Sequence, residues 1–136
     1  RYCNFSSKFY CRNLIHKDAN FELMLVCWDE GQFSPLHDHN GQHGWMLIMQ
    51  GCLLEELYGS PQDILNGDVV VSKTRKLNLG DISYITDDIA CHKISNAVPS
   101  RSVSLHLYSK PVASCHRYDP RSGEFKMQQM SYYETS

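Results

Sequence analysis

The sequence has little net charge and lacks any long apolar run. It carries 13 lysines and arginines against 15 aspartates and glutamates, and the basic residues form no continuous stripe. Nucleic acid and anionic membrane surfaces are therefore poor candidates as partners. No stretch approaches the roughly 18 consecutive apolar residues of a membrane-spanning helix, and the first residues lack the apolar core of a signal peptide. We expect a cytoplasmic protein that binds neither nucleic acid nor membranes.

The six cysteines include no C-x-x-C pair. Cys27 and Cys52 lie within apolar runs, where a free thiol packs as a small hydrophobe. An even number of cysteines leaves three disulfides as the alternative, but a chain of 136 residues can bury a core without them. The pattern favours reduced thiols and a single domain that spans residues 1–136.

Helical periodicity is weak along the whole chain, and short extended segments dominate. The turn signal Asn66-Gly67 is typical of a hairpin. Many short strands at regular spacing predict a mainly-β fold, either an antiparallel sandwich or a barrel. We expect strands over residues 21–28, 45–58 with an interruption at Gly51, 69–72, 76–79, 81–85 and 102–108.

Two histidines, His37 and His39, are separated by one residue. On an extended strand, residues i and i+2 face the same side, so both imidazoles can reach one ion. On a helix the same spacing would point them apart. A polar strand face that carries two histidines is the alternative, and the pair alone does not decide between them.

The spacing of residues around this pair resembles the first motif of the cupin superfamily, with Gly44 where many members have a glutamate. Later in the chain, His92 stands where the second motif supplies one more histidine, although its spacing from Gly80 is one residue longer than usual. The resemblance implies a single cupin barrel, a double-stranded β-helix of the jelly-roll type. It also implies a metal ion on His37, His39 and His92.

Glycine at position 44 would leave such a metal with three neutral imidazoles and its full 2+ charge. A site of this kind favours an anionic ligand, and a thiolate fits because metal binding deprotonates a thiol. A degenerate cupin that only binds a ligand is the alternative. Histidine-rich sites also accept zinc, copper and nickel, so the residues alone do not identify the metal.

Residues 102–108 alternate strictly between polar and apolar side chains. The alternation places Ser104, His106 and Tyr108 on one face of a strand. That face can be solvated, or it can line a cavity. In a cavity the serine hydroxyl would fix the tautomer of the imidazole, and the imidazole would orient the phenol.

The sequence as a whole resembles cysteine dioxygenase over about residues 10–125. The resemblance implies that the enzyme oxidises L-cysteine with dioxygen to cysteine sulfinic acid at an iron(II) ion, and we expect it to act as a monomer. The resembling stretches are Tyr-Cys-Arg-Asn-Leu (10–14), Leu-Val-Cys-Trp-Asp-Glu-Gly (25–31), His-Asp-His-Asn-Gly-Gln-His-Gly (37–44), Tyr-Ile-Thr-Asp-Asp-Ile-Ala-Cys-His (84–92) and Ser-Leu-His-Leu-Tyr-Ser (104–109).

The same resemblance assigns roles to the remaining candidate residues. Arg12, assisted by Tyr10, would bind the substrate carboxylate, since a guanidinium offers a planar fork of donors. By itself an arginine in a strand is more commonly a surface charge. Tyr108, positioned by His106 and Ser104, would lie beside the reacting sulfur and oxygen.

The sequence departs from the family at three places. In animal members, a cysteine at the position of Gly44 forms a thioether with the tyrosine that matches Tyr108, and glycine cannot form it. Ser109 is followed by Lys110 where cysteine-selective members often have proline. The family's N-terminal helical segment is missing here. Dioxygenases of other thiols such as 3-mercaptopropionate tend to replace the carboxylate-binding arginine with glutamine, so Arg12 favours cysteine.

Overall fold

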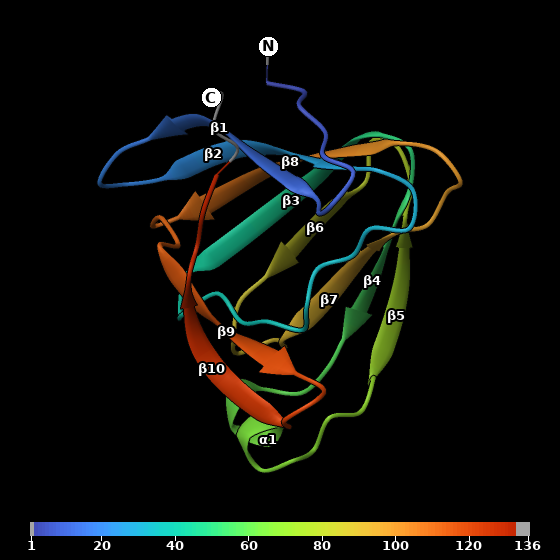
Figure 1. The fold of residues 1–136 in the computed structure, drawn as a ribbon. Helices are drawn as coiled ribbons and strands as arrows, with labels where there is room; N and C mark the ends of the chain where they lie inside the picture. The colour runs from blue at the N-terminus through green and yellow to red at the C-terminus, as the bar shows by residue number, and fades with distance from the viewer. Residues whose placement is uncertain (1, 133–136) are drawn as a thin grey trace.

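The computed structural model describes residues 2–132. Over these residues the chain forms strands and one short helix (Figure 1), which confirms the prediction of a mainly-β fold. The elements are β1 (Cys11–Lys17), β2 (Glu22–Trp28), β3 (His43–Gln50), β4 (Leu53–Leu57), α1 (Pro61–Leu65), β5 (Lys73–Leu77), β6 (Ile82–Ile85), β7 (His92–Asn96), β8 (Ser102–Ser109), β9 (Ser114–Asp119) and β10 (Glu124–Gln129).

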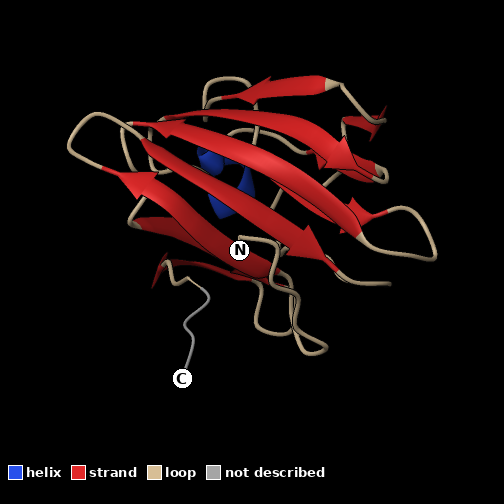
Figure 2. Cartoon of the chain, turned by 90° about the horizontal axis from the view of Figure 1, so that it is seen from above, coloured by secondary structure: helices blue, strands red, loops and turns tan. Residues whose placement is uncertain are grey.

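The strands form antiparallel sheets that enclose the interior (Figures 1 and 2). One sheet has the strand order β1-β2-β8-β3-β6, another has the order β5-β4-β7, and β9 pairs with β10. Isolated bridges join His37 to His92 at the start of β7 and to Arg117 in β9. The hydrogen-bonded strands do not close into a ring, so the molecule consists of facing sheets rather than a closed barrel.

The core lies between the sheets, because alternate residues of each strand point inward. Met24 of β2 and Leu53 of β4 have no exposed surface. Burying an apolar side chain of this size stabilises the fold by about 1.5–3 kcal/mol. The main cluster draws on β2, β3, β4, β5, β7, β8 and β9 and consists of Met24, Val26, Trp28, Met46, Ile48, Leu53, Leu77, Ile94, Tyr108, Val112 and Cys115.

The register of the larger sheet fixes which side chains meet at one end of this core. Strand β8 lies between β2 and β3, and its Tyr108 is opposite Glu22 on one side and Gly44 on the other. Gly44 is in turn opposite Ile85 of β6. One row across four strands therefore combines a carboxylate, a phenol, a glycine and an apolar side chain.

The expected strand at residues 69–72 is wrong, and so is the expected hairpin at Asn66-Gly67. Instead, Ser60 caps helix α1 through a capping box with Asp63. Gly67, with a φ of +86°, follows the helix C-cap residue Asn66, so the Asn-Gly signal ends a helix. In residues 69–72 the only backbone hydrogen bonds to another strand come from Ser72 to the carbonyl of Leu57, and pairing with β4 begins at β5.

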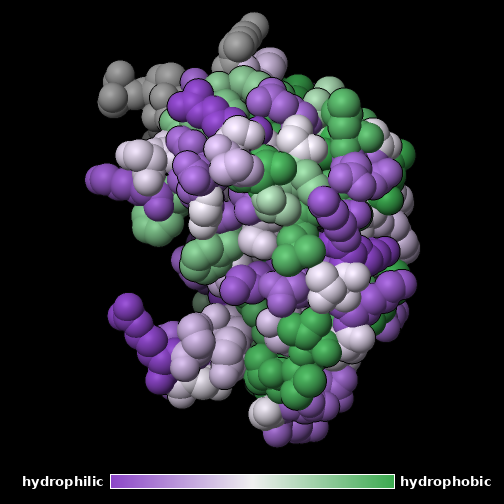
Figure 3. All heavy atoms as spheres, turned by 90° about the vertical axis from the view of Figure 1, so that its right-hand side faces the viewer, coloured by the Kyte–Doolittle hydropathy of each residue, from purple (hydrophilic) through white to green (hydrophobic). Residues whose placement is uncertain are grey.

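No helix among residues 2–132 has the length and apolar character needed to cross a membrane. Hydrophilic and hydrophobic residues are interspersed over the face seen in Figure 3. That face is the right-hand side of Figure 1, where β4 and β5 lie.

Candidate active site

Three histidines from two separate segments converge inside the fold. One ring nitrogen each of His37, His39 and His92 lies within 4.8 Å of the others. The Nε2 atoms of His37 and His92 are 3.1 Å apart, and the ring centroids of the three pairs are separated by 4.6–5.3 Å. The structure thus brings together the three residues expected to ligate one ion, and their role as ligands stays a prediction.

The segment that carries His37 and His39 is a loop between β2 and β3, not the extended strand that we expected. Isolated bridges hold it: the backbone amides of His37 and His92 each donate to the other residue's carbonyl, at 3.0 and 3.1 Å, and His37 is also bridged to Arg117. The backbone amide of His39 donates to Asp87 at 2.9 Å. The side chain of Asp38 accepts from the backbone amide of His116 at 2.7 Å. Individual hydrogen bonds, rather than the regular pairing of a β-strand, therefore orient the two imidazoles.

The hydrogen bonds of the rings leave nitrogen lone pairs free at the point of convergence. Nδ1 of His37 lies 2.8 Å from the carbonyl oxygen of Pro35, and Nδ1 of His92 lies 2.8 Å from Glu55. Both partners only accept, so each Nδ1 carries the proton and each Nε2 presents its lone pair. His39 is buried, and neither of its ring nitrogens has a hydrogen-bond partner.

Two buried ring nitrogens without partners carry a desolvation cost unless something occupies the centre. Burial, followed by the repulsion that protonated imidazoles would have with His92, lowers the pKa of both His37 and His39 well below the usual value. Both imidazoles are therefore neutral at ordinary pH, and this is the form that ligates metals. These residues fit a divalent metal ion.

A buried carboxylate, which the sequence reasoning missed, orients His92. Glu55 has no exposed surface and accepts hydrogen bonds from Arg75 at 2.6 Å and from Ser83 at 2.8 Å, besides its contact with His92. Burial by itself raises its pKa, but the hydrogen bonds from His92 and Ser83 and the charge of Arg75 lower it to about 2. The sequence did contain a signal for this residue, since Glu55 lies between Leu53 and Leu57 on the same, buried face of β4.

If the three histidines hold a metal ion, replacing Glu55 with glutamine should lower the affinity for iron(II), the ion that the family resemblance implies, by about 10–100-fold, as the loss of a group that holds a metal-ligating histidine generally does. Glutamine keeps the shape but has one oxygen where the carboxylate has two. Iron titration of the metal-free protein measures the effect. Glu56→Gln is the matched control, because the side chain of Glu56 projects from the face of β4 opposite to that of Glu55. Equal iron affinity in the Glu55 variant and wild type would contradict this role.

The polar row of β8 faces the interior and forms a continuous set of hydrogen bonds. Ser104 Oγ lies 2.6 Å from Nε2 of His106, and Nδ1 of His106 lies 3.3 Å from the hydroxyl of Tyr108. The indole of Trp28 donates to Ser104 at 3.0 Å. Burial lowers the pKa of His106 to about 3 and raises the pKa of Tyr108. The row therefore combines a neutral imidazole with a protonated phenol, and all three side chains are buried.

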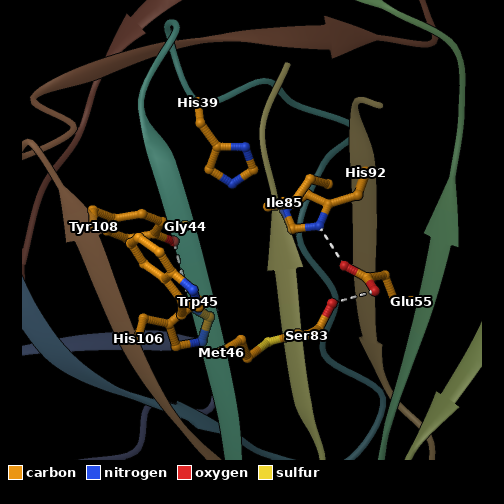
Figure 4. Close-up of a pocket in the computed structure, with 10 residues that line it drawn as sticks. All are labelled: His39, Gly44, Trp45, Met46, Glu55, Ser83, Ile85, His92, His106 and Tyr108. Carbon is orange, nitrogen blue, oxygen red and sulfur yellow. Dashed lines mark hydrogen bonds and ion pairs between the residues drawn. The ribbon is translucent and has the colours of Figure 1, made fainter. Parts of the chain in front are cut away.

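Tyr108 lies next to the histidine cluster. Its ring centroid is 5.7 Å from that of His39, and both side chains border the same small cavity (Figure 4). A Cβ atom on Gly44 would lie only 3.1 Å from Cε1 of Tyr108, so the glycine makes room for the phenol. The cavity is lined by His39, Gly44, Trp45, Met46, Glu55, Ser83, Ile85, His92, His106 and Tyr108.

Arg12 is buried rather than on the surface, which rules out the interpretation of a solvated charge. Its Nη1 donates to the carbonyl of Ser131 at 2.7 Å, and Tyr132 covers the guanidinium at 4.8 Å. Nη2 has no hydrogen-bond partner. Tyr10 stacks on Trp28 with ring centroids 4.8 Å apart. The Glu22 carboxylate lies 4.0 Å from Nη2 of Arg12, beyond hydrogen-bonding distance, so this donor can still form a hydrogen bond with an anionic group.

The hydroxyl of Tyr10 accepts a hydrogen bond from Arg117 Nη2 at 3.2 Å. A second cation therefore reaches the neighbourhood of Arg12 from β9. Sequence reasoning did not single out Arg117, and its polar surroundings in the chain offered no signal that distinguishes it from a surface arginine.

Comparison with known proteins gives a consistent result. The family model of cysteine dioxygenase type I matches residues 1–121. Cysteine dioxygenase type 1 of Rattus norvegicus is 35% identical over 134 residues, which are 97% of this chain and 66% of the relative. The Homo sapiens protein is 36% identical with the same coverage. The chain therefore spans about two thirds of the length of these relatives.

Solved structures with low sequence identity share the fold. A Klebsiella pneumoniae protein with a double-stranded β-helix domain has a TM-score of 0.65 at 14% identity, covering 95% of this chain and 92% of its own. A cupin superfamily protein from Desulfitobacterium hafniense has a TM-score of 0.61 at 11% identity, covering 79% of this chain and 84% of its own. The cupin fold expected from the sequence is confirmed.

Proposed function

The chain belongs to the cysteine dioxygenase type I family, and we propose that it oxidises L-cysteine with dioxygen to cysteine sulfinic acid at an iron(II) ion. The observation that carries the proposal is the convergence of three imidazoles, one of which has two buried nitrogens without partners. Within the described part of the chain, this group contains no carboxylate.

His37, His39 and His92 would hold the metal. Three neutral ligands leave its charge uncompensated, and such a site favours a substrate that brings a thiolate. When bound, iron(II) supplies the one-electron pathway that a spin-paired thiol and triplet dioxygen lack. Both oxygen atoms end on the sulfur, and its four-electron oxidation balances the reduction of dioxygen, so no external reductant is needed.

Arg12 binds the substrate carboxylate through Nη2, the donor that has no partner in the protein. Tyr10, just before β1 on the same face, supports this site through its contact with Trp28 and its hydroxyl. An anchored carboxylate restricts how the thiol lies, and restricting the reactants is worth up to about 7–11 kcal/mol in well-oriented systems.

The row on β8 positions the phenol of Tyr108 toward the reacting atoms. Trp28 can only donate, so Ser104 accepts from it. When the serine hydroxyl then donates to Nε2 of His106, Nδ1–H donates to the Tyr108 oxygen. This direction leaves the phenolic proton for a hydrogen bond to the substrate or to dioxygen.

We further propose that the enzyme acts in the cytoplasm as a monomer, with residues 1–136 forming one domain. The cysteines support a reducing compartment, because all six are free thiols. The three histidines already converge within one copy of the chain, which supports a monomer.

Oxygen consumption with a panel of thiols tests the function. Iron-loaded protein should consume dioxygen with cysteine, and more slowly with 3-mercaptopropionate and cysteamine, which lack the amine and the carboxylate respectively. A faster rate with 3-mercaptopropionate would indicate a dioxygenase of another thiol. Iron-loaded protein that consumes no dioxygen with any of them would indicate a cupin that only binds a ligand.

A further inference from the structure

A second buried carboxylate, Glu22, faces the unpartnered donor of Arg12. Glu22 has no exposed surface. Its Oε1 accepts a hydrogen bond from the backbone amide of Val112 at 3.1 Å. Its Oε2 has no hydrogen-bond partner and lies 4.0 Å from Arg12 Nη2, which has no hydrogen-bond partner either. A buried acceptor and a buried donor that both lack hydrogen bonds carry a cost that a suitable ligand would remove.

The strand register places Glu22 beside Tyr108, which lines the cavity. Glu22 shares the inward face of β2 with Met24 and Val26, and it is directly opposite Tyr108 in the β2–β8 ladder. Side chains of directly opposed residues lie side by side on the same face of a sheet. Tyr108 in turn lies next to His39. Glu22 therefore lies between two residues of the proposed site, beside the phenol of Tyr108 and facing the guanidinium of Arg12.

We propose that Glu22 is a specificity-determining residue that accepts a hydrogen bond from the amino group of the substrate. The inference rests on the proposed function, since it concerns the substrate of the same site. An α-amino acid carries a carboxylate acceptor and an amine donor on one carbon. These two groups complement Nη2 of Arg12 and Oε2 of Glu22, which are adjacent and unpartnered. A thiol without the amine satisfies only Arg12.

The opposite charges of Arg12 and Glu22 also favour a substrate that carries an amine. Arg12 alone would attract any mercaptocarboxylate, but a carboxylate 4.0 Å from its guanidinium offsets that attraction. The net charge of Arg12 and Glu22 together is therefore close to zero, and it attracts a mercaptocarboxylate without an amine only weakly. A substrate that brings both groups gains a hydrogen bond at each member of the pair, so the pair discriminates by the presence of the amine.

The variant Glu22→Gln tests the inference, because it replaces the acceptor Oε2 with a hydrogen-bond donor. The amide of Val112 still needs an acceptor, so the glutamine oxygen takes the place of Oε1 and the NH₂ group takes the place of Oε2. An acceptor becomes a donor, and the negative charge is lost. Cysteine should bind about 10–100-fold more weakly, and 3-mercaptopropionate should bind as tightly as in wild type or more tightly.

Affinities are measured by calorimetry without dioxygen on iron-loaded protein, and the kcat/KM values of both thiols are measured separately. Glu30→Gln is the matched control, because Glu30 is exposed in the turn after β2. It should leave the affinity ratio of the two thiols unchanged. Glu22→Asp keeps the charge but moves the carboxylate back by one methylene group, so it should also reduce the affinity for cysteine relative to 3-mercaptopropionate. This variant tests the inference if the glutamine variant does not fold.

An unchanged affinity ratio in a folded Glu22 variant overturns the inference, even when wild type oxidises cysteine. Wild type that binds both thiols but oxidises neither overturns the proposed function, while the affinity ratio still tests Glu22. Wild type that binds neither thiol overturns both.

Discussion

Alanine in place of His92 should abolish iron binding and thiol oxidation together. The substitution removes one of only three imidazoles at the centre. It also leaves Glu55 Oε2 buried without the partner that it has at 2.8 Å. An orphaned buried charge costs about 1–3 kcal/mol or more, so the free energy of unfolding should fall as well. Iron content after reconstitution and the rate of oxygen consumption measure the two main effects.

His16→Ala is the control for this experiment. His16 is half-exposed and contacts Asp18 in the β1–β2 turn, far along the chain from the cluster. Its removal should change neither iron content nor rate. If the His92 variant bound iron as tightly as wild type, the three-histidine centre would be refuted.

Alanine in place of Arg12 should raise the KM for cysteine by at least about 30-fold and leave the iron content unchanged. Truncating one member of a buried, hydrogen-bonded charge pair costs about 2–5 kcal/mol, and each 1.4 kcal/mol corresponds to about tenfold in affinity. Arg12 makes no hydrogen bond to the three histidines; its own partner is the Ser131 carbonyl. Oxygen consumption as a function of cysteine concentration separates KM from kcat.

The Arg12 variant also leaves Glu22 without a nearby cation, so unfolding should be measured in parallel. Arg101→Ala is the control, because Arg101 is half-exposed and pairs loosely with Asp29 at 3.8 Å. An Arg12 variant that is folded, iron-loaded and unchanged in cysteine affinity would remove Arg12 from the substrate site.

Strands with strict alternation were predictable, because one face of each must be buried. This applies to β8, whose residues 102–108 alternate between polar and apolar side chains, whereas β2 was predicted from a continuous apolar run. The break between β3 and β4 was also predictable from Gly51. Its φ of +75° favours glycine, and a Cβ there would lie 2.2 Å from the hydroxyl of Ser102.

Segments shaped by contacts distant in sequence were harder to predict. The Asn66-Gly67 signal fits either a hairpin or a helix end, and only the capping box at Ser60 separates the two. The hairpin of β9 and β10 joins the fold through a bridge from His37 to Arg117, which no local pattern encodes.

The three candidate metal ligands could be predicted from the spacing of the histidines, whereas the buried carboxylates around them were not recognised. His37, His39 and His92 occupy recognisable motif positions. Glu55 instead interrupts the buried face of β4 between Leu53 and Leu57, and Glu22 begins the apolar strand β2. A charged residue at an inward position is costly unless it is paired, so such positions indicate a polar site within a β fold.

Mass spectrometry of the product formed from cysteine under isotopically labelled dioxygen tests the central claim most directly. If three imidazoles hold an iron ion that joins dioxygen to the sulfur, the product is cysteine sulfinic acid with label in both of its sulfur-bound oxygens. A product that carries oxygen from water, or cystine as the sole oxidised species, would contradict the account.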